Sequence, residues 1–274
     1  MKRFTTILAA AALLLTSCEE YLDVKPRGYD IASKVEHYEG LLIGQDLCLL
    51  DECFPYMCFD CHMDPEGFEN VYSTIGSSAT KAYKWEKDVY REDETCGEWN
   101  SFTTALYYYN MVINGVPDAE DGTPEKRLAL QAEARMLRAY CTFLMSEFFG
   151  DVPIITTAST MDGDYSLHSR DEVVEFVLTE MGEAVGQLED ATAHCKRVFR
   201  TAGLALYGRV LFQYGMYERA LEQLGLSFEA VKESPELGLV DWNPRMDSNG
   251  EVDLIVYDYE NHEQLFCLTS MSSI

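Results

Sequence analysis

The sequence has few basic residues. It contains 21 lysines and arginines against 47 aspartates and glutamates, which gives a formal net charge of −26 at neutral pH. Proteins that bind nucleic acid or an anionic membrane surface do so with Lys and Arg, because these side chains displace counterions from phosphate groups. The charge balance therefore argues against both partners, and we expect no nucleic-acid binding. Hydrophobic residues still make up 47% of the chain, which indicates a folded protein and not a disordered acidic tail.

Catalytic and membrane-spanning motifs are also missing. The five histidines are scattered along the chain, with no pair at the spacing of helical metal ligands. There is no Gly-x-Ser-x-Gly nucleophile elbow and no phosphate-cradling glycine loop. Beyond the N-terminus, no apolar run approaches the ~20 residues that cross a bilayer. We therefore expect neither an enzyme nor a bound cofactor.

The N-terminus has the pattern of a bacterial lipoprotein signal. Lys2 and Arg3 precede an apolar run over residues 7–15, which is too short to span a membrane but fits the core of a signal peptide. The run ends in Leu-Thr-Ser directly before Cys18, which is the arrangement of a lipobox. This predicts a signal peptide over residues 1–17 and lipidation of Cys18, so that acyl chains anchor the protein to a membrane.

The middle of the chain has helical periodicity. Residues 19–97 are irregular except for a helical pattern over 32–50. From there on, apolar residues recur three and four positions apart, with an N-cap signal at Thr123 and Pro124 and a stop signal at Gly150. We expect helices over 98–113, 124–149, 169–188, 197–214 and 217–232. In the second of these, the side chains expected to face the core are Leu128, Ala132, Ala134, Leu137, Ala139, Tyr140, Phe143, Leu144 and Phe148.

The last four of these helices are typical of paired, tetratricopeptide-like repeats. Ala202, Gly203, Ala205 and Gly208 are small enough to let two helices approach closely, and a Gly-Met-Tyr turn at 215–217 starts the next helix. Only about two such units are present, so they must pack against other parts of the chain. The predicted fold is mainly α, a scaffold of helical pairs with irregular loops and a minor β hairpin near the C-terminus, around residues 239–256.

Several segments share their order and spacing with one known family. They are the opening Cys-Glu-Glu-Tyr-Leu-Asp-Val-Lys-Pro-Arg-Gly at 18–28, then Trp99, Leu106 and Asn110, the block Glu-Ala-Arg-Met-Leu-Arg-Ala-Tyr at 133–140, Phe-Phe-Gly-Asp-Val-Pro at 148–153, Arg-Asp-Glu-Val at 170–173, and the repeat at 197–220. Together these segments resemble the SusD/RagB family of Bacteroidota outer-membrane lipoproteins.

The resemblance implies a function. Members of the family are not enzymes but ligand-capture subunits, which bind oligosaccharides or, in some cases, peptides for nutrient uptake. They lie over a SusC-like TonB-dependent outer-membrane barrel. Glu19, Glu20 and Asp23 follow the predicted lipid-bearing Cys18 and resemble the family's surface-export signal. The resemblance thus implies an outer-membrane, lipid-anchored protein that faces the cell exterior.

The resemblance also implies a division of the chain. Residues 18–235 correspond to the family's N-terminal helical, tetratricopeptide-like domain, and 236–274 to the start of its C-terminal region, either truncated here or reduced in a short member of the family. The family's C-terminal half contributes much of the ligand surface. Two interpretations therefore stay open: a glycan-capture subunit, or an interaction scaffold that lacks a competent ligand site.

Aromatic side chains in loops are the candidates for contact with a sugar, because a pyranose ring stacks on an aromatic face. The candidates are Trp85, Tyr83, Tyr72 and Trp242, of which Trp85 is the first choice. We assign Trp99 and residues 107–109, which lie on a predicted helix, to the core. Arg135, Arg138 and Asp151 are expected to be structural.

The nine cysteines allow one further interpretation. Cys58, Cys61 and His62 form a literal Cys-x-x-Cys-His, the pattern of haem attachment, and with Cys48 and Cys53 they are also weak candidates for a zinc cluster. A cysteine-rich metal-binding lipoprotein is therefore the third, least favoured hypothesis. Disulfides among the eight cysteines other than Cys18 are favoured over metal at a cell surface, and we expect no metal.

Overall fold

The computed structural model describes residues 32–44, 81, 84–90, 92, 96–159, 163–190, 197–235, 237–238 and 265. The chain divides into two compact units, Met1–Ala32 and Ser33–Ile274, and every element below belongs to the second. The predicted lipidation site at Cys18, the cysteine cluster at 58–62 and the hairpin at 239–256 lie outside the described residues.

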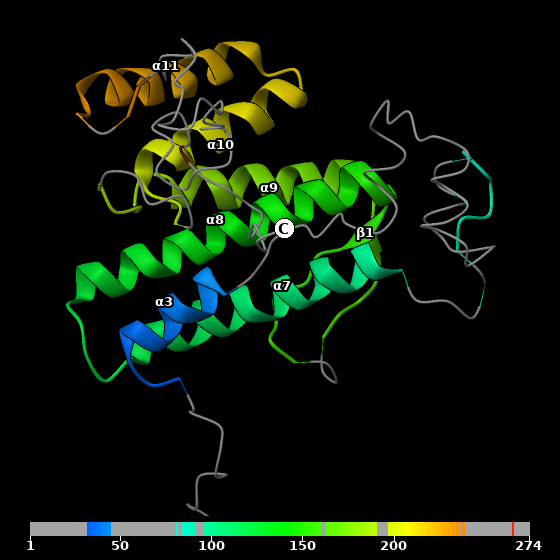
Figure 1. The fold of residues 1–274 in the computed structure, drawn as a ribbon, viewed down its shortest axis with the longest axis horizontal. Helices are drawn as coiled ribbons and strands as arrows, with labels where there is room; N and C mark the ends of the chain where they lie inside the picture. Colours follow the sequence, from blue (N-terminus) through cyan, green and yellow to red (C-terminus); the bar gives the residue numbers. More distant parts are fainter. Residues whose placement is uncertain are drawn as a thin grey trace, which may run out of the picture. The chain divides into compact units, whose positions relative to one another are not determined.

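The described part of the chain is mainly helical, with two short strands and irregular connections, which confirms the predicted fold class (Figure 1). In chain order the elements are α3 (Val35–Ile43), α7 (Gly97–Gly115), the 3-10 turn η1 (Val116–Asp118), α8 (Pro124–Phe149), β1 (Val152–Pro153), β2 (Leu167–His168), α9 (Arg170–Ala184), α10 (Arg200–Gln213) and α11 (Tyr217–Glu233).

Local signals set the ends of α8 where the sequence predicts them. The Thr123 hydroxyl accepts a hydrogen bond from the Lys126 backbone N–H at 3.2 Å, and Pro124 occupies the first helical position. Gly150 ends the helix with a φ of 81°, which is open to glycine without strain. The helix is therefore fixed at both ends by its own chain neighbours.

The starts and ends of α9 and α10 differ from the prediction. Helix α9 ends at Ala184 and not near 188, and α10 begins at Arg200 and not at 197. In place of a first helical turn, Arg197 and the Val198 backbone N–H both bind the carboxylate of Glu133. A contact between residues 64 positions apart thus holds the segment before α10 against α8.

Helix α8 is the centre of the packing. It lies between α7 and α9, while α3 packs on α7 and α8 (Figure 1). Most of the largest fully buried side chains come from these helices, and each contributes roughly 1.5–3 kcal/mol by leaving water; they include Leu106, Tyr109, Leu130, Met136, Tyr140 and Met181. Leu128 is exposed, contrary to the prediction, because it lies near the start of α8, where this face is not yet covered; Ala132, one turn further along the same face, is buried.

A buried ion pair joins distant parts of the helical core. The Arg197 guanidinium contacts both oxygens of Glu133 on α8, at 2.6–2.9 Å, and Glu39 on α3 at 3.2 Å. Lys126 on α8 also contacts Glu39, at 3.0 Å. These contacts hold α3, α8 and the segment before α10 together.

Helices α10 and α11 form a close pair of their own. A Cβ atom at Gly208 on α10 would lie 2.6 Å from the side chain of Leu224 on α11, so a larger residue does not fit without movement. The Ser227 hydroxyl of α11 donates to the Thr201 carbonyl at 2.9 Å. This confirms the predicted close approach through small residues.

Candidate functional site

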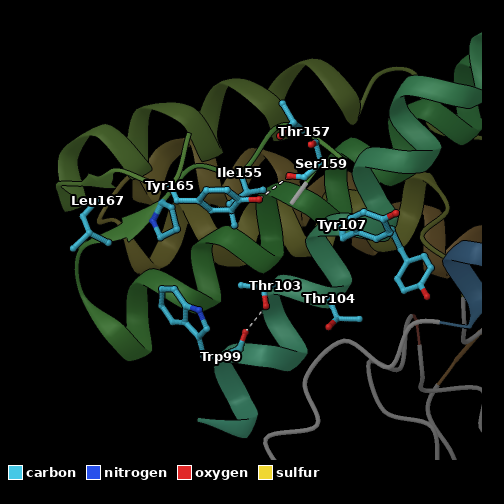
Figure 2. A pocket seen from close by; sticks show the side chains of 11 residues that line it. Trp99, Thr103, Thr104, Tyr107, Ile155, Thr157, Ser159, Tyr165 and Leu167 are labelled. Atoms are coloured by element: carbon cyan, nitrogen blue, oxygen red, sulfur yellow. Dashed lines mark hydrogen bonds between the residues drawn. The ribbon is translucent and has the colours of Figure 1, made fainter. Parts of the chain in front are cut away.

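A groove of about 570 Å³ lies between α7 and the segment that follows β1 (Figure 2). Trp99, Thr103 and Tyr107 form one of its walls and recur at every fourth position, so they share one face of α7. Thr104 and Tyr108 extend this wall. The opposite face of the same helix carries the buried side chains, so that α7 separates the groove from the core.

The second wall comes from residues between β1 and the start of α9. Antiparallel pairing of Val152 with His168 and of Pro153 with Leu167 brings the two ends of this segment together. Within it, the Tyr165 hydroxyl donates to the Ser159 carbonyl at 2.7 Å, which fixes the position of the ring (Figure 2). The side chains of this wall are those of Pro153, Ile155, Thr157, Ser159, Tyr165 and Leu167.

The groove combines aromatic rings with hydroxyl groups. Trp99 is half-buried, and its ring is held edge-on against Phe149 at a centroid distance of 5.1 Å. Tyr107 and Tyr165 are partly exposed. None of the described lining residues carries a formal charge at neutral pH. The groove therefore suits an uncharged ligand that has both apolar faces and hydrogen-bonding groups.

A series of hydrogen-bonded, buried polar side chains lies behind the second wall. The Asn110 side-chain amide donates to the carbonyl oxygens of Ile155 at 3.0 Å and Thr157 at 3.3 Å. Its own oxygen accepts from Arg138 of α8 at 2.8 Å, and Arg138 in turn pairs with Glu180 of α9. This series of contacts thus links the groove wall, through α7 and α8, to α9.

The charge state of Glu180 follows from this arrangement. Burial by itself raises the pKa of the Glu180 carboxyl, but hydrogen bonds from Arg135 and the charge of Arg138 outweigh burial, so that its pKa lies below the ordinary value. Arg135 contacts Glu180 at 2.8 Å. The carboxylate is therefore held ionised between two guanidinium groups, which confirms the structural role expected for both arginines.

Of the sequence-based ligand candidates, Trp85 lies among the described residues and is not part of the described lining of this groove. Trp85 is 71% exposed, has a φ of 54°, and does not line it. Tyr72, Tyr83 and Trp242 lie outside the described residues, and contact with a ligand stays a prediction for all four.

The prediction that Trp99 and residues 107–109 belong to the core is only partly right. Tyr109 is buried as predicted, but Trp99, Tyr107 and Tyr108 line the groove. A signal was present, because Trp99 and Tyr107 fall four positions either side of Thr103, away from the apolar stripe that contains Leu106.

The described residues contain neither a cluster of metal ligands nor a membrane-spanning helix. No group of three or more potential metal ligands occurs in that part of the chain. Cys58, Cys61 and His62 lie outside it, so the weak metal candidates stay untested. No helix that the structure describes has the length and apolar character needed to cross a membrane.

Comparison with solved structures shows a common fold at low sequence identity. The chain is similar to a putative sugar-binding protein from Bacteroides vulgatus, with 15% identity and a TM-score of 0.58 over 77% of this chain and 48% of that one. It is also similar to a laminarin-binding SusD-like protein, with 16% identity and a TM-score of 0.55 over 77% and 47%. A third is surface glycan-binding protein A from Bacteroides fluxus, with 20% identity and a TM-score of 0.52 over 75% and 45%.

These structures are longer than the chain, which spans about half the length of each of the three. No curated protein matches the sequence. A family model does match it, over residues 20–212, and that family is described as starch-binding and associating with the outer membrane. Because the match covers well over half of the sequence, this chain belongs to the SusD-like family.

Proposed function

We propose that this protein captures neutral oligosaccharides in the groove beside α7. The family is a starch-binding one, and three proteins of similar structure are a putative sugar-binding, a laminarin-binding and a surface glycan-binding protein. We further propose that it presents its ligand to a SusC-like TonB-dependent barrel for nutrient uptake. The resemblance of the sequence to the SusD/RagB family supports this step.

The composition of the groove carries the proposal. A pyranose ring has an apolar face of C–H groups and a rim of hydroxyls, which matches a surface of aromatic rings beside Thr and Ser side chains. A neutral glycan is favoured over an anionic one, because the described lining has no cation and the chain carries a net charge of −26. The described lining has no carboxylate either, whereas glycoside hydrolysis commonly uses two. A binding role is therefore proposed in preference to a catalytic one.

The place of action is proposed from the N-terminal sequence. Cleavage before Cys18 and its lipidation would anchor the protein, and the acids at Glu19 and Glu20 support display on the outer face of the outer membrane. We expect the wild-type protein in the outer-membrane fraction and accessible to protease added to whole cells. A Cys18→Ala variant that stays in that fraction would contradict the anchor.

Calorimetric titration tests which class of ligand the protein binds. The panel contains maltoheptaose and laminarin as neutral glycans, polygalacturonate as an anionic one, and a mixture of short peptides. We expect binding of a neutral glycan, and a loss of about tenfold in affinity for Trp99→Ala and for Tyr165→Ala, or about 1.4 kcal/mol. Tyr217→Ala serves as the control, because Tyr217 is an exposed aromatic on α11 and does not line the groove.

Two results would contradict the proposal. One is binding of only polygalacturonate or peptide. The other is a neutral glycan that binds equally well to wild type and to both groove variants.

An interaction scaffold is the second candidate function. The observation in its favour is the exposed apolar stripe of Tyr217, Leu221 and Phe228 on α11. A wild-type protein that binds no ligand of the panel but forms a complex with a SusC-like barrel would favour the scaffold.

A further inference from the structure

We propose that Asn110 is a positioning residue that sets the second wall of the groove. It touches no ligand in this account, and acts through the backbone of residues 155–157. Its importance for affinity rests on the proposed function, whereas its effect on the wall does not.

The position of Asn110 separates it from the groove itself. It lies on α7, three residues beyond Tyr107, and its side chain is fully buried. Its amide nitrogen donates to the carbonyls of Ile155 and Thr157, two residues whose own side chains line the groove. One buried side chain therefore fixes two points of the wall.

The orientation of the Asn110 amide is determined by the chemistry of its partners. The Arg138 guanidinium can only donate, so it must face the Asn110 oxygen, at 2.8 Å. The two wall carbonyls can only accept, so they must face the nitrogen. Arg138 is itself held by Glu180. Helices α8 and α9 thus decide which way the amide points.

Helix packing alone does not explain an asparagine at this position. Leu106 and Tyr109 on the same helix show that apolar side chains fill the neighbouring core positions. The β1–β2 pairing covers only residues 152–153 and 167–168, and the described residues include no strand beside 155–157. Ile155 is buried, and a buried backbone carbonyl needs a partner. Asn110 therefore supplies to Ile155 the donor that a neighbouring strand would otherwise supply, and it also binds the carbonyl of the exposed Thr157.

A fixed wall affects binding through preorganisation. When the wall already has its bound shape, the ligand does not have to order it, and less binding free energy is lost. Asn110 should therefore raise affinity for the glycan without contacting it. The effect is expected mainly in the dissociation rate, as for most differences between variants of one site.

Hydrogen–deuterium exchange of Asn110→Asp tests the role directly. Asp keeps the size of the side chain and still accepts from Arg138, but it turns an oxygen towards the two carbonyls instead of a donor. We expect amides within 154–159 to exchange about tenfold faster, with α8 and α10 unchanged. Asn114→Asp is the matched control, because Asn114 lies on the same helix but is exposed. It should leave the exchange of the wall as in wild type.

The same variants are then titrated with the neutral glycan that the wild type binds. We expect Asn110→Asp to bind about tenfold more weakly and Asn114→Asp to bind as the wild type does. Unchanged exchange at 154–159 in Asn110→Asp overturns the positioning role. Faster exchange with unchanged affinity overturns the claim that the fixed wall raises the affinity for the glycan. If the wild type binds no glycan, the proposed function fails, while the exchange data still decide whether Asn110 holds the wall.

A measurement on the wild type covers the case in which Asn110→Asp does not fold. NMR should show slowly exchanging side-chain amide protons for Asn110 and a coupling across the hydrogen bond to the carbonyl carbon of Ile155. Rapid exchange of these protons and no such coupling would overturn the proposal without any variant.

Discussion

Helices α7, α8 and α9, of which α7 forms one wall of the groove, and the pair α10–α11 bury their side chains in different ways. In the first group, even polar residues such as Asn110, Glu133 and Arg138 are buried and bound to partners. In the second, α11 leaves the large apolar side chains of Leu221 and Phe228 exposed, the former at 74%. An end repeat normally needs a polar outer face. The first group therefore forms a buried interior, whereas the described part of α11 presents an apolar face.

The comparison shows that a clear amphipathic pattern in a helix does not predict how many of its side chains are buried. On α11, Tyr217, Leu221, Leu224 and Phe228 follow one stripe at helical spacing, yet its fully buried residues are the small Ala220 and Ser227. Helix α8 has a mixed pattern because neighbours cover it on several sides, and buried charges such as Glu133 interrupt its apolar residues. The helix that looks most regular in sequence thus contributes less to the described core.

The largest difference between the two regions should appear on truncation of one leucine in each. Leu106→Ala removes a fully buried side chain from α7 and should lower the free energy of unfolding by about 2–5 kcal/mol. Leu221→Ala should change it by less than about 0.5 kcal/mol. Chemical denaturation of both variants measures this, and similar losses would refute the contrast.

Substitutions at two glycines should distinguish the close α10–α11 contact from the exposed side of α11. Gly208→Val should destabilise by about 1–3 kcal/mol, because its side chain collides with Leu224. Gly225→Ala should stabilise by about 0.5–1 kcal/mol, since a Cβ there meets nothing within 4 Å and alanine favours a helix. Thermal unfolding of both variants checks the signs. A stabilising Gly208→Val would show that the two helices are not closely packed.

Low pH should destabilise the contact between α8 and α9, because Glu180 becomes protonated. Its folded pKa lies below the ordinary value, so ionised Glu180 stabilises the fold above the unfolded pKa of about 4.3. This stabilisation is lost as the pH falls through the folded pKa. Between about pH 5 and pH 3, Tm should therefore fall more steeply for wild type than for Glu180→Gln, which cannot titrate there. Equal slopes would show that the carboxylate does not stabilise this junction.

The smallest effect on stability is expected on the open face of α11. Leu221→Lys should leave the free energy of unfolding within about 0.5 kcal/mol of wild type. It should also lower the binding of a hydrophobic dye and any self-association, because it breaks the apolar stripe beside Glu218 and Glu222. Dye fluorescence and light scattering measure this. Unchanged dye binding together with a clear loss of stability would mean that Leu221 is covered.

Much of the fold could be predicted because its signals are local. Thr123, Pro124 and Gly150 set the ends of α8 through their immediate neighbours. The start of α10 could not be predicted, since the segment before it makes a distant contact, that of Arg197 with Glu133. The same holds for the groove. Periodicity places Trp99 on a helix, but its exposure depends on where the segment after β1 lies.

The three tryptophans allow the most direct test of the central claim, that the α7 groove holds the glycan. Trp99 lines the groove, while Trp85 and Trp242 are the candidates from sequence. With 5-fluorotryptophan incorporated and each ¹⁹F resonance assigned by a Trp→Phe variant, titration with a neutral glycan should shift the Trp99 resonance and leave the other two in place. A shift of Trp85 or Trp242 with Trp99 unchanged, or no shift at saturating glycan, would contradict the account.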